Sequence, residues 1–313
     1  RYWDILIYNH LREKNIVIPP KRKSEKIEKF EGAYVKDPIV GMHKWVMSFD
    51  LNSLYPHLIM QYNISPETLV SSSEKKDGLV NKILNDEIKN DTDYCMTPNG
   101  AFFRKDKRGF LPEIMEIMYN DRTKYKKLML DAKQKYEDTK DPKLLKDISK
   151  YNNIQMAKKI SLNSAYGAIG NNWFRYFDLM VATAITLSGQ LSIRWIEKAL
   201  NIYLNKLLDT KNEDYVIASD TDSVYITFDK LINKVFPTGT ETEKIVTFLD
   251  KIATEKLEPF IDKSFKALAQ TVNAYEQKMD MSREVIADKG IWTAKKRYIL
   301  NAWDIEGVRY KTP

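Results

Sequence analysis

Two stretches of the chain alternate between apolar and polar residues in the way that predicts β-strands. Residues 45–50 alternate with a period of two, so that Asp50 ends a strand. In residues 215–226, two apolar runs flank an Asp-Thr-Asp triplet, which predicts a tight hairpin whose bend carries Asp220 and Asp222. Carboxylates are therefore expected at the ends of two separate strand segments.

Longer stretches repeat apolar residues at spacings of three and four, which predicts helices. One long helix begins at Pro112, and a second runs towards Gly167 and Gly170, which can close its C-terminal end. Two helices joined by a polar turn make a hairpin. Further helices are expected over residues 178–207 and from residue 241 to about residue 277.

The N-terminal third contains weaker patterns. Residues 1–18 have a helical rhythm that Pro19 and Pro20 end. The basic stretch 21–29 is expected to be a solvated loop, with a phosphate contact as the alternative. Residues 71–94 are rich in Ser, Lys, Asp and Asn, which predicts an exposed insertion.

Composition sets outer limits. The 313 residues, 43% of them apolar, can bury a sizeable core and suffice for two units. The 50 Lys and Arg against 43 Asp and Glu give a net charge of +7, which suits a polyanionic partner but also suits many ordinary proteins. No run approaches the length of a membrane span and no signal peptide precedes the first helix, so a soluble, cytoplasmic protein is expected.

Cysteine and histidine are too sparse for the common metal cages. Cys95 is the single cysteine, which excludes an internal disulfide and a cysteine zinc site. His10, His43 and His57 lack zinc-ligand spacing and are expected to be structural. The first residue is Arg1 instead of methionine, and the last residues follow a well-patterned segment, so we interpret the chain as an internal piece of a longer protein.

The aspartates are the best candidates for metal ligands. Alone, the triplet Asp220-Thr221-Asp222 favours a turn whose carboxylates accept bonds from local backbone donors. Asp50 changes the interpretation, because its strand could converge on the same bend. Magnesium takes few protein oxygens and leaves positions for water and phosphate. Two ions about 4 Å apart can activate a hydroxyl and stabilise a leaving oxygen, which is the chemistry of nucleotidyl transfer.

The predicted helical hairpin carries a second set of candidates. Arg122 and Lys126 share one face of the first helix, and Lys159, Asn163 and Tyr166 share one face of the second. Converging cations from two helices would suit a triphosphate, with the arginine as a bidentate fork. The alternative is a solvated basic stripe.

Four motifs in this order resemble those of family B DNA polymerases, and the resemblance covers nearly the whole chain. The sequence around them, such as residues 63–68 and 173–176, looks most like the replicative polymerases of tailed bacteriophages. The motifs are Asp50-Leu51-Asn52-Ser53-Leu54-Tyr55-Pro56, Lys159 with Asn163-Ser164-Ala165-Tyr166-Gly167, Asp220-Thr221-Asp222-Ser223, and Lys295-Lys296-Arg297-Tyr298.

The resemblance implies a metal site of two magnesium ions. Asp50 and Asp222 would be the catalytic ligands of both ions, and Leu51 would add a backbone oxygen. Asp220 would be a secondary acidic residue near the site.

The same resemblance implies binding sites for nucleotide and DNA. Tyr55 would exclude a 2′-hydroxyl, while Asn163 and Tyr166 would shape the base-pair pocket. Without the family context, both tyrosines would be read as packing residues. The triphosphate would be bound by the backbone amides of Ser53 and Leu54 and by the side chains of Arg122, Lys126 and Lys159. The primer-template would be bound by Lys295, Lys296, Arg297 and Tyr298. The last four could otherwise be a solvated strand edge.

The chain departs from the family pattern in places. His57 stands where the family commonly has serine, and Ala218-Ser219 replaces the more usual Tyr-Gly. The fingers insertion is short. Nothing resembles the acidic exonuclease motifs, and no sequence remains for a thumb after Pro313.

These observations predict an α+β fold: an antiparallel palm sheet flanked by helices, with an inserted helical fingers hairpin. The expected division is palm over residues 1–111, fingers over 112–170 and palm over 171–313, with exonuclease and thumb absent.

The predicted function is template-directed extension of a DNA primer with deoxynucleoside triphosphates by two-metal nucleotidyl transfer. Expected partners are primer-template DNA, the nucleotides, a chain carrying an exonuclease or thumb, and a sliding clamp, with no membrane. The setting would be the host cytoplasm if the source is viral. The alternatives are a two-metal nuclease, a non-catalytic nucleic-acid-binding fragment, and one half of a split polymerase that requires a partner chain.

Overall fold

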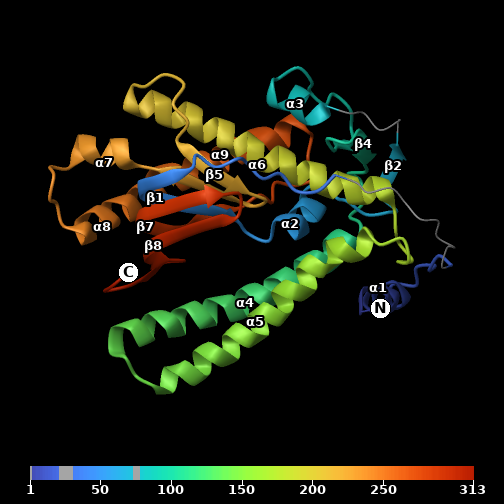
Figure 1. The fold of residues 1–313 in the computed structure, drawn as a ribbon. Coiled ribbons are helices and arrows are strands. Elements are labelled where there is room, and N and C mark those ends of the chain that lie inside the picture. The colour runs from blue at the N-terminus through green and yellow to red at the C-terminus, as the bar shows by residue number, and fades with distance from the viewer. Residues whose placement is uncertain (1, 21–30, 73–77) are drawn as a thin grey trace.

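The computed structural model describes residues 2–20, 31–72 and 78–313, so the basic stretch 21–29 lies outside the described residues. Within these ranges, the centre of the molecule is an antiparallel sheet in the order β5-β6-β1-β7-β8-β9 (Figure 1). A small second sheet has the order β2-β4-β3. The strands are β1 Gly41–Leu51, β2 Leu69–Ser72, β3 Cys95–Met96, β4 Ala101–Phe103, β5 Val216–Asp220, β6 Ser223–Thr227, β7 Met281–Ala294, β8 Arg297–Ile305 and β9 Val308–Arg309.

The position of β1 between β6 and β7 brings the two predicted acidic segments together. Asp50 lies opposite Ser223 in the register of β1 and β6. One residue further, the Leu51 amide donates to the Asp222 carbonyl at 2.8 Å. The end of β1 is therefore fixed to the bend of the β5–β6 hairpin by backbone hydrogen bonds.

Helices lie on both sides of this sheet in the view of Figure 1. Figure 1 shows the hairpin of α4 and α5 on one side of the sheet and α6 on the other. Met47 and Phe49 of β1 belong to the main core together with α6, whereas Val46 points to a small cluster with Trp292 on the opposite face, as alternation requires. The helices are α1 Tyr2–Glu13, α2 Leu54–Gln61, α3 Leu79–Leu84, α4 Phe110–Thr139, α5 Lys143–Ile169, α6 Leu179–Leu208, α7 Asp229–Val235, α8 Thr242–Ile252 and α9 Glu258–Thr271.

The predicted α+β class and the helical hairpin are confirmed, and so is the helix over residues 178–207. Of the two glycines expected to close the second hairpin helix, Gly170 is its C-cap, whereas Gly167 lies inside α5. The helix expected from residue 241 is present as α8 and α9, which are joined by a π-helical segment, Ala253–Leu257. It ends at Thr271, because Asn273 has a left-handed backbone.

One expectation was right only in part, and another was wrong. Residues 73–77 of the predicted exposed insertion 71–94 lie outside the described residues, and most of residues 78–94 are exposed. The insertion nevertheless contains α3, whose Leu79, Val80 and Ile83 are buried, because they form one apolar helical face. The expectation that no run reaches the length of a membrane span overlooked α6, which is long and apolar enough by composition. Its apolar window is 67% buried inside the fold, as in the core helix of a globular protein.

Asp178 caps the first turn of α6. Its Oδ1 accepts from the amides of Met180 at 2.8 Å and Val181 at 3.2 Å. Replacement by alanine is expected to lower the free energy of unfolding by about 1 kcal/mol, because two amides lose their partner. The measurement is urea unfolding, and Glu241→Ala is the matched control, since Glu241 is the N-cap of α8 without a side-chain hydrogen bond to the helix. Equal effects of the two substitutions would contradict the capping role.

Candidate active site

A cavity of about 240 Å³ lies where the ends of β1 and of the β5–β6 hairpin face the helical hairpin. It gathers nearly all residues that the sequence singled out for metal and nucleotide. The lining residues are Asp50, Asn52, Ser53, Leu54, Tyr55, Arg122, Lys126, Lys159, Asn163, Tyr166, Thr221, Asp222, Glu284 and Glu306. Leu51 and Asp220 are adjacent in the chain but do not line the cavity.

The two carboxylates of this cavity lie in an acidic, desolvated environment. Burial, followed by the charges of Asp222 and Glu284, raises the pKa of Asp50 well above its ordinary value. The pKa of Asp222 is also raised, first by burial, while Lys159 acts in the opposite direction. Two anions held close together with little water favour either protonation or a bound cation.

The donor set fits magnesium bound together with phosphate. Among the described residues, no three His, Cys, Asp or Glu form a complete metal cage. Two carboxylates and an open cavity suffice for magnesium, because this ion keeps waters and takes phosphate oxygens as further ligands. Asp50 and Asp222 are the residues that would hold it.

Arg122 reaches the cavity from α4 with its guanidinium nearly buried. The side chain is 7% exposed, and Nη1 donates to Ser53 Oγ at 2.6 Å. Its Nε is buried and has no hydrogen-bond partner among the described residues, and burial lowers the pKa of the guanidinium. Ser53 precedes α2 with a left-handed backbone, φ 47°, and Ser53 and Leu54, at the N-terminus of α2, line the cavity. A helix N-terminus beside an unsatisfied guanidinium suits an anion.

Two tyrosines form one wall of the cavity. Tyr55 of α2 and Tyr166 of α5 stack with ring centroids 4.7 Å apart and planes inclined by 29°. Burial, followed by the charges of Tyr166 and Asp222, raises the pKa of Tyr55 to about 12, so its hydroxyl stays protonated at neutral pH. Asn163 lies one turn before Tyr166 on the same face of α5.

The basic motif lies at a different place, in the turn between β7 and β8. Lys296 Nζ contacts both oxygens of Asp220 at 2.7 and 2.8 Å, and Lys295 pairs with Asp37 at 3.1 Å. The Tyr298 hydroxyl lies 2.6 Å from that of Tyr225. Arg297 is exposed at the start of β8. Asp220 thus ties the basic turn to the hairpin that carries Asp222.

The residues that depart from the family pattern, His57, Ala218 and Ser219, are buried and do not line the cavity. His57 is buried, and its Nδ1 lies 3.1 Å from the carbonyl oxygen of Ser53. Its ring packs edge to face on Tyr119, with ring centroids 4.3 Å apart. Burial lowers its pKa, so it is a neutral packing residue. Ala218 and Ser219 are buried in β5.

Sequence reasoning missed four lining residues: Asn52, Thr221, Glu284 and Glu306. Glu284 lies in β7, but residues 281–286 do not alternate between apolar and polar residues, so no local pattern pointed to it. No local sequence pattern marks Glu306 as a cavity residue, because only the pairing of strands in the sheet brings the β8–β9 turn to the cavity.

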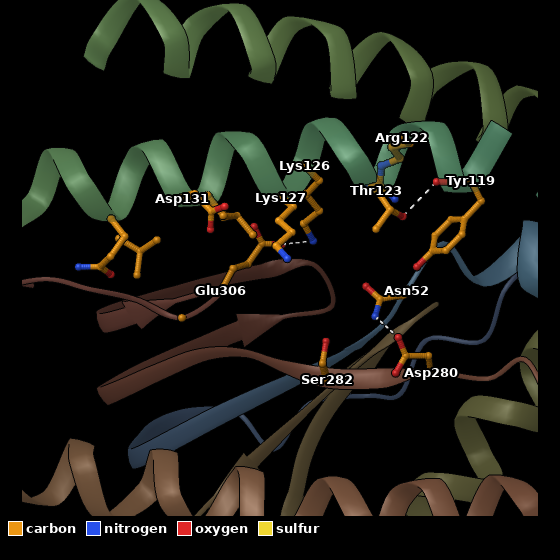
Figure 2. Close-up of a pocket in the computed structure, with 14 residues that line it drawn as sticks. Asn52, Tyr119, Arg122, Thr123, Lys126, Lys127, Asp131, Asp280, Ser282 and Glu306 are labelled. Atoms are coloured by element: carbon orange, nitrogen blue, oxygen red, sulfur yellow. Dashed lines mark hydrogen bonds and ion pairs between the residues drawn. The ribbon is translucent and has the colours of Figure 1, made fainter. Parts of the chain in front are cut away.

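A neighbouring cleft of about 570 Å³ lies between α4 and the C-terminal strands. Figure 2 shows Arg122, Lys126 and Lys127 above it on α4, and Glu306, Ser282 and Asp280 below. Because Asn52, Arg122, Lys126 and Glu306 line both spaces, the cavity and the cleft are adjacent.

The family profile of DNA polymerase family B matches residues 4–269. The DNA-directed DNA polymerase of Escherichia phage RB69 is 39% identical in an alignment covering 99% of this chain and 40% of that protein. That of Enterobacteria phage T4 is 35% identical with the same coverage, and DNA polymerase beta of African swine fever virus is 30% identical over 86% of this chain and 23% of that protein. This chain therefore spans about 40% of the length of its phage relatives. With four-fifths of its length or more inside the matched region, the chain belongs to DNA polymerase family B.

Proposed function

We propose that the chain forms the polymerase centre of a DNA-directed DNA polymerase, which extends a primer with deoxynucleoside triphosphates on a DNA template. The observation that carries this proposal is the convergence of Asp50, Asp222, Arg122, Lys126 and Lys159 on one cavity. The names of both phage relatives support it.

In the proposed reaction, Asp50 and Asp222 would hold two magnesium ions, whose charge would assist attack by the primer hydroxyl and departure of pyrophosphate. The first amides of α2, at Ser53 and Leu54, would bind the triphosphate from the sheet side. Arg122, with its unsatisfied Nε, would stabilise the charge that develops on the phosphates.

The remaining cavity residues would select the nucleotide. Lys126 and Lys159 add point charges for phosphate oxygens. Tyr55, held by its stack on Tyr166, would lie beneath the sugar, and Asn163 would border the base pair. The turn with Lys295 and Lys296 would contact the backbone of the primer-template, which positions the duplex without reading its sequence.

The domain roles belong to the same proposal. The segments 1–111 and 171–313 would form the palm, and 112–170 the fingers. A chain carrying an exonuclease or thumb and a sliding clamp are proposed partners, and the proposed setting is the cytoplasm, of a host cell if the source is viral.

Primer extension in magnesium, with a template that dictates one nucleotide at a time, tests this function. We expect incorporation only of the complementary deoxynucleotide. Strand cleavage without any need for nucleotides would instead indicate a nuclease. DNA binding without incorporation, rescued by a thumb-bearing chain, would indicate one half of a split enzyme.

Tyr55→Ala is expected to reduce discrimination against ribonucleotides by about tenfold, because overpacking of the 2′-hydroxyl against the ring costs about 1–3 kcal/mol. The measurement is the ratio of kcat/KM for a deoxynucleotide and its ribonucleotide. Tyr55→Phe keeps the ring and is the matched control, with discrimination expected to remain near the original value. Unchanged discrimination in the alanine variant would refute the steric role.

A further inference from the structure

We propose that Glu306 competes with the incoming triphosphate for Lys126, so that this carboxylate sets how tightly the cavity holds a nucleotide. Lys126 Nζ contacts Glu306 Oε1 at 2.7 Å, and the pair bridges the hairpin helix α4 and the turn between β8 and β9. The inference rests on the proposed function, because it assumes that Lys126 receives phosphate.

Glu306 is held in place by the backbone of its turn. Its φ is 51°, in the left-handed region, and its amide donates to the Glu284 carbonyl at 2.6 Å. The next residue is also anchored, since the Gly307 amide donates to Asp304 Oδ1 at 3.0 Å. The carboxylate is therefore presented to α4 by a fixed turn instead of a loose loop.

The ion pair lies inside the space that a triphosphate would enter. Lys126 and Glu306 both line the catalytic cavity and the neighbouring cleft (Figure 2). Among the described residues that line the cavity, this is the one ion pair within 4.0 Å. Arg122 instead donates to the uncharged Ser53 hydroxyl.

Electrostatics disfavours contact of Lys126 with Glu306 and with a phosphate at the same time. An ammonium has three donors and could contact carboxylate and phosphate together. A carboxylate beside a phosphate is a like-charge contact in a half-buried site, however, which is unfavourable. The side chains are 26% and 32% exposed, so Glu306 can turn towards solvent when phosphate arrives and return when pyrophosphate leaves.

Binding of inorganic tripolyphosphate in magnesium, measured by calorimetry on the whole chain, tests this competition without base or sugar contacts. Glu306→Gln is expected to tighten binding by about two- to fivefold, the range for a partly exposed ion pair. Pyrophosphate is expected to inhibit primer extension by this variant more strongly by a similar factor. Glu306→Asp shortens the side chain by one methylene, so its affinity for tripolyphosphate is expected to lie between those of the wild type and Glu306→Gln.

The control variants separate the ion pair from a general loss of negative charge. Asp131 lines the same cleft further along α4, so Asp131→Asn removes one charge there and is expected to leave affinity nearly unchanged. In a Lys126→Met background, Glu306→Gln is expected to have no further effect, and an equal gain in that background would overturn the competition. A wild-type chain that binds and extends while Glu306→Gln changes nothing would refute this inference alone. A wild-type chain that neither binds tripolyphosphate nor extends primers would refute the proposed function, and this inference with it.

Discussion

Replacing Asp222 by asparagine is expected to reduce primer extension by about a thousandfold or more, while binding of primer-template remains near its original strength. A bound metal ion stabilises the charge of the transition state of nucleotidyl transfer by several kcal/mol. A change of about 1.4 kcal/mol in the activation free energy changes the rate by a factor of ten. Asp222 lies at the bend beside Asp50, in the cavity and not on the basic turn proposed to hold DNA. The measurements are single-nucleotide incorporation and a filter-binding titration.

Asp220→Asn is the matched control for this substitution, since it makes the same isosteric change two residues away. Asp220 pairs with Lys296 and does not line the cavity, so a much smaller loss is expected. If Asp222→Asn extended primers at the original rate, the metal assignment would be wrong. A large loss of DNA binding would instead mean that Asp222 supports the duplex-binding surface.

Arg122→Ala is expected to raise KM for the incoming nucleotide by up to about a hundredfold, because hydrogen bonds to charged groups contribute about 1.5–3 kcal/mol each. The guanidinium is buried, and within the part of the chain that the structure describes its Nε has no hydrogen-bond partner. Arg122→Lys should restore little, since an ammonium cannot form the bidentate fork. The measurement is the dependence of incorporation rate on nucleotide concentration.

Lys124→Ala provides the control, because Lys124 is an exposed cation on the same helix that does not line the cavity. Its removal is expected to leave KM nearly unchanged. An unaltered KM in Arg122→Ala, or equal effects of both variants, would contradict the phosphate contact. Thermal unfolding should change little in Arg122→Ala, because the lost partner, Ser53, is a neutral hydroxyl.

The chain's own pattern was enough to predict most of its local structure. The strand ending at Asp50, the hairpin bearing Asp222 and the helices of the 112–170 region follow from periods of two and 3.6 that are local properties of the sequence. The motifs identified the family and pointed to the residues that line the cavity. Composition misjudged α3 and α6, because the fate of an apolar helical face depends on what packs against it.

Only the tertiary structure decided how these elements meet. Strand order is a long-range property, so nothing near Asp50 in the sequence shows that β1 lies between β6 and β7. That order brings Glu284 beside the two aspartates, and the turn after β8 brings Glu306 to Lys126. The sequence by itself determined which side chains are candidates for binding metal and phosphate. The packing of strands distant in the chain determined which of them share one cavity, because Coulomb energy depends on separation in space and not on separation along the chain.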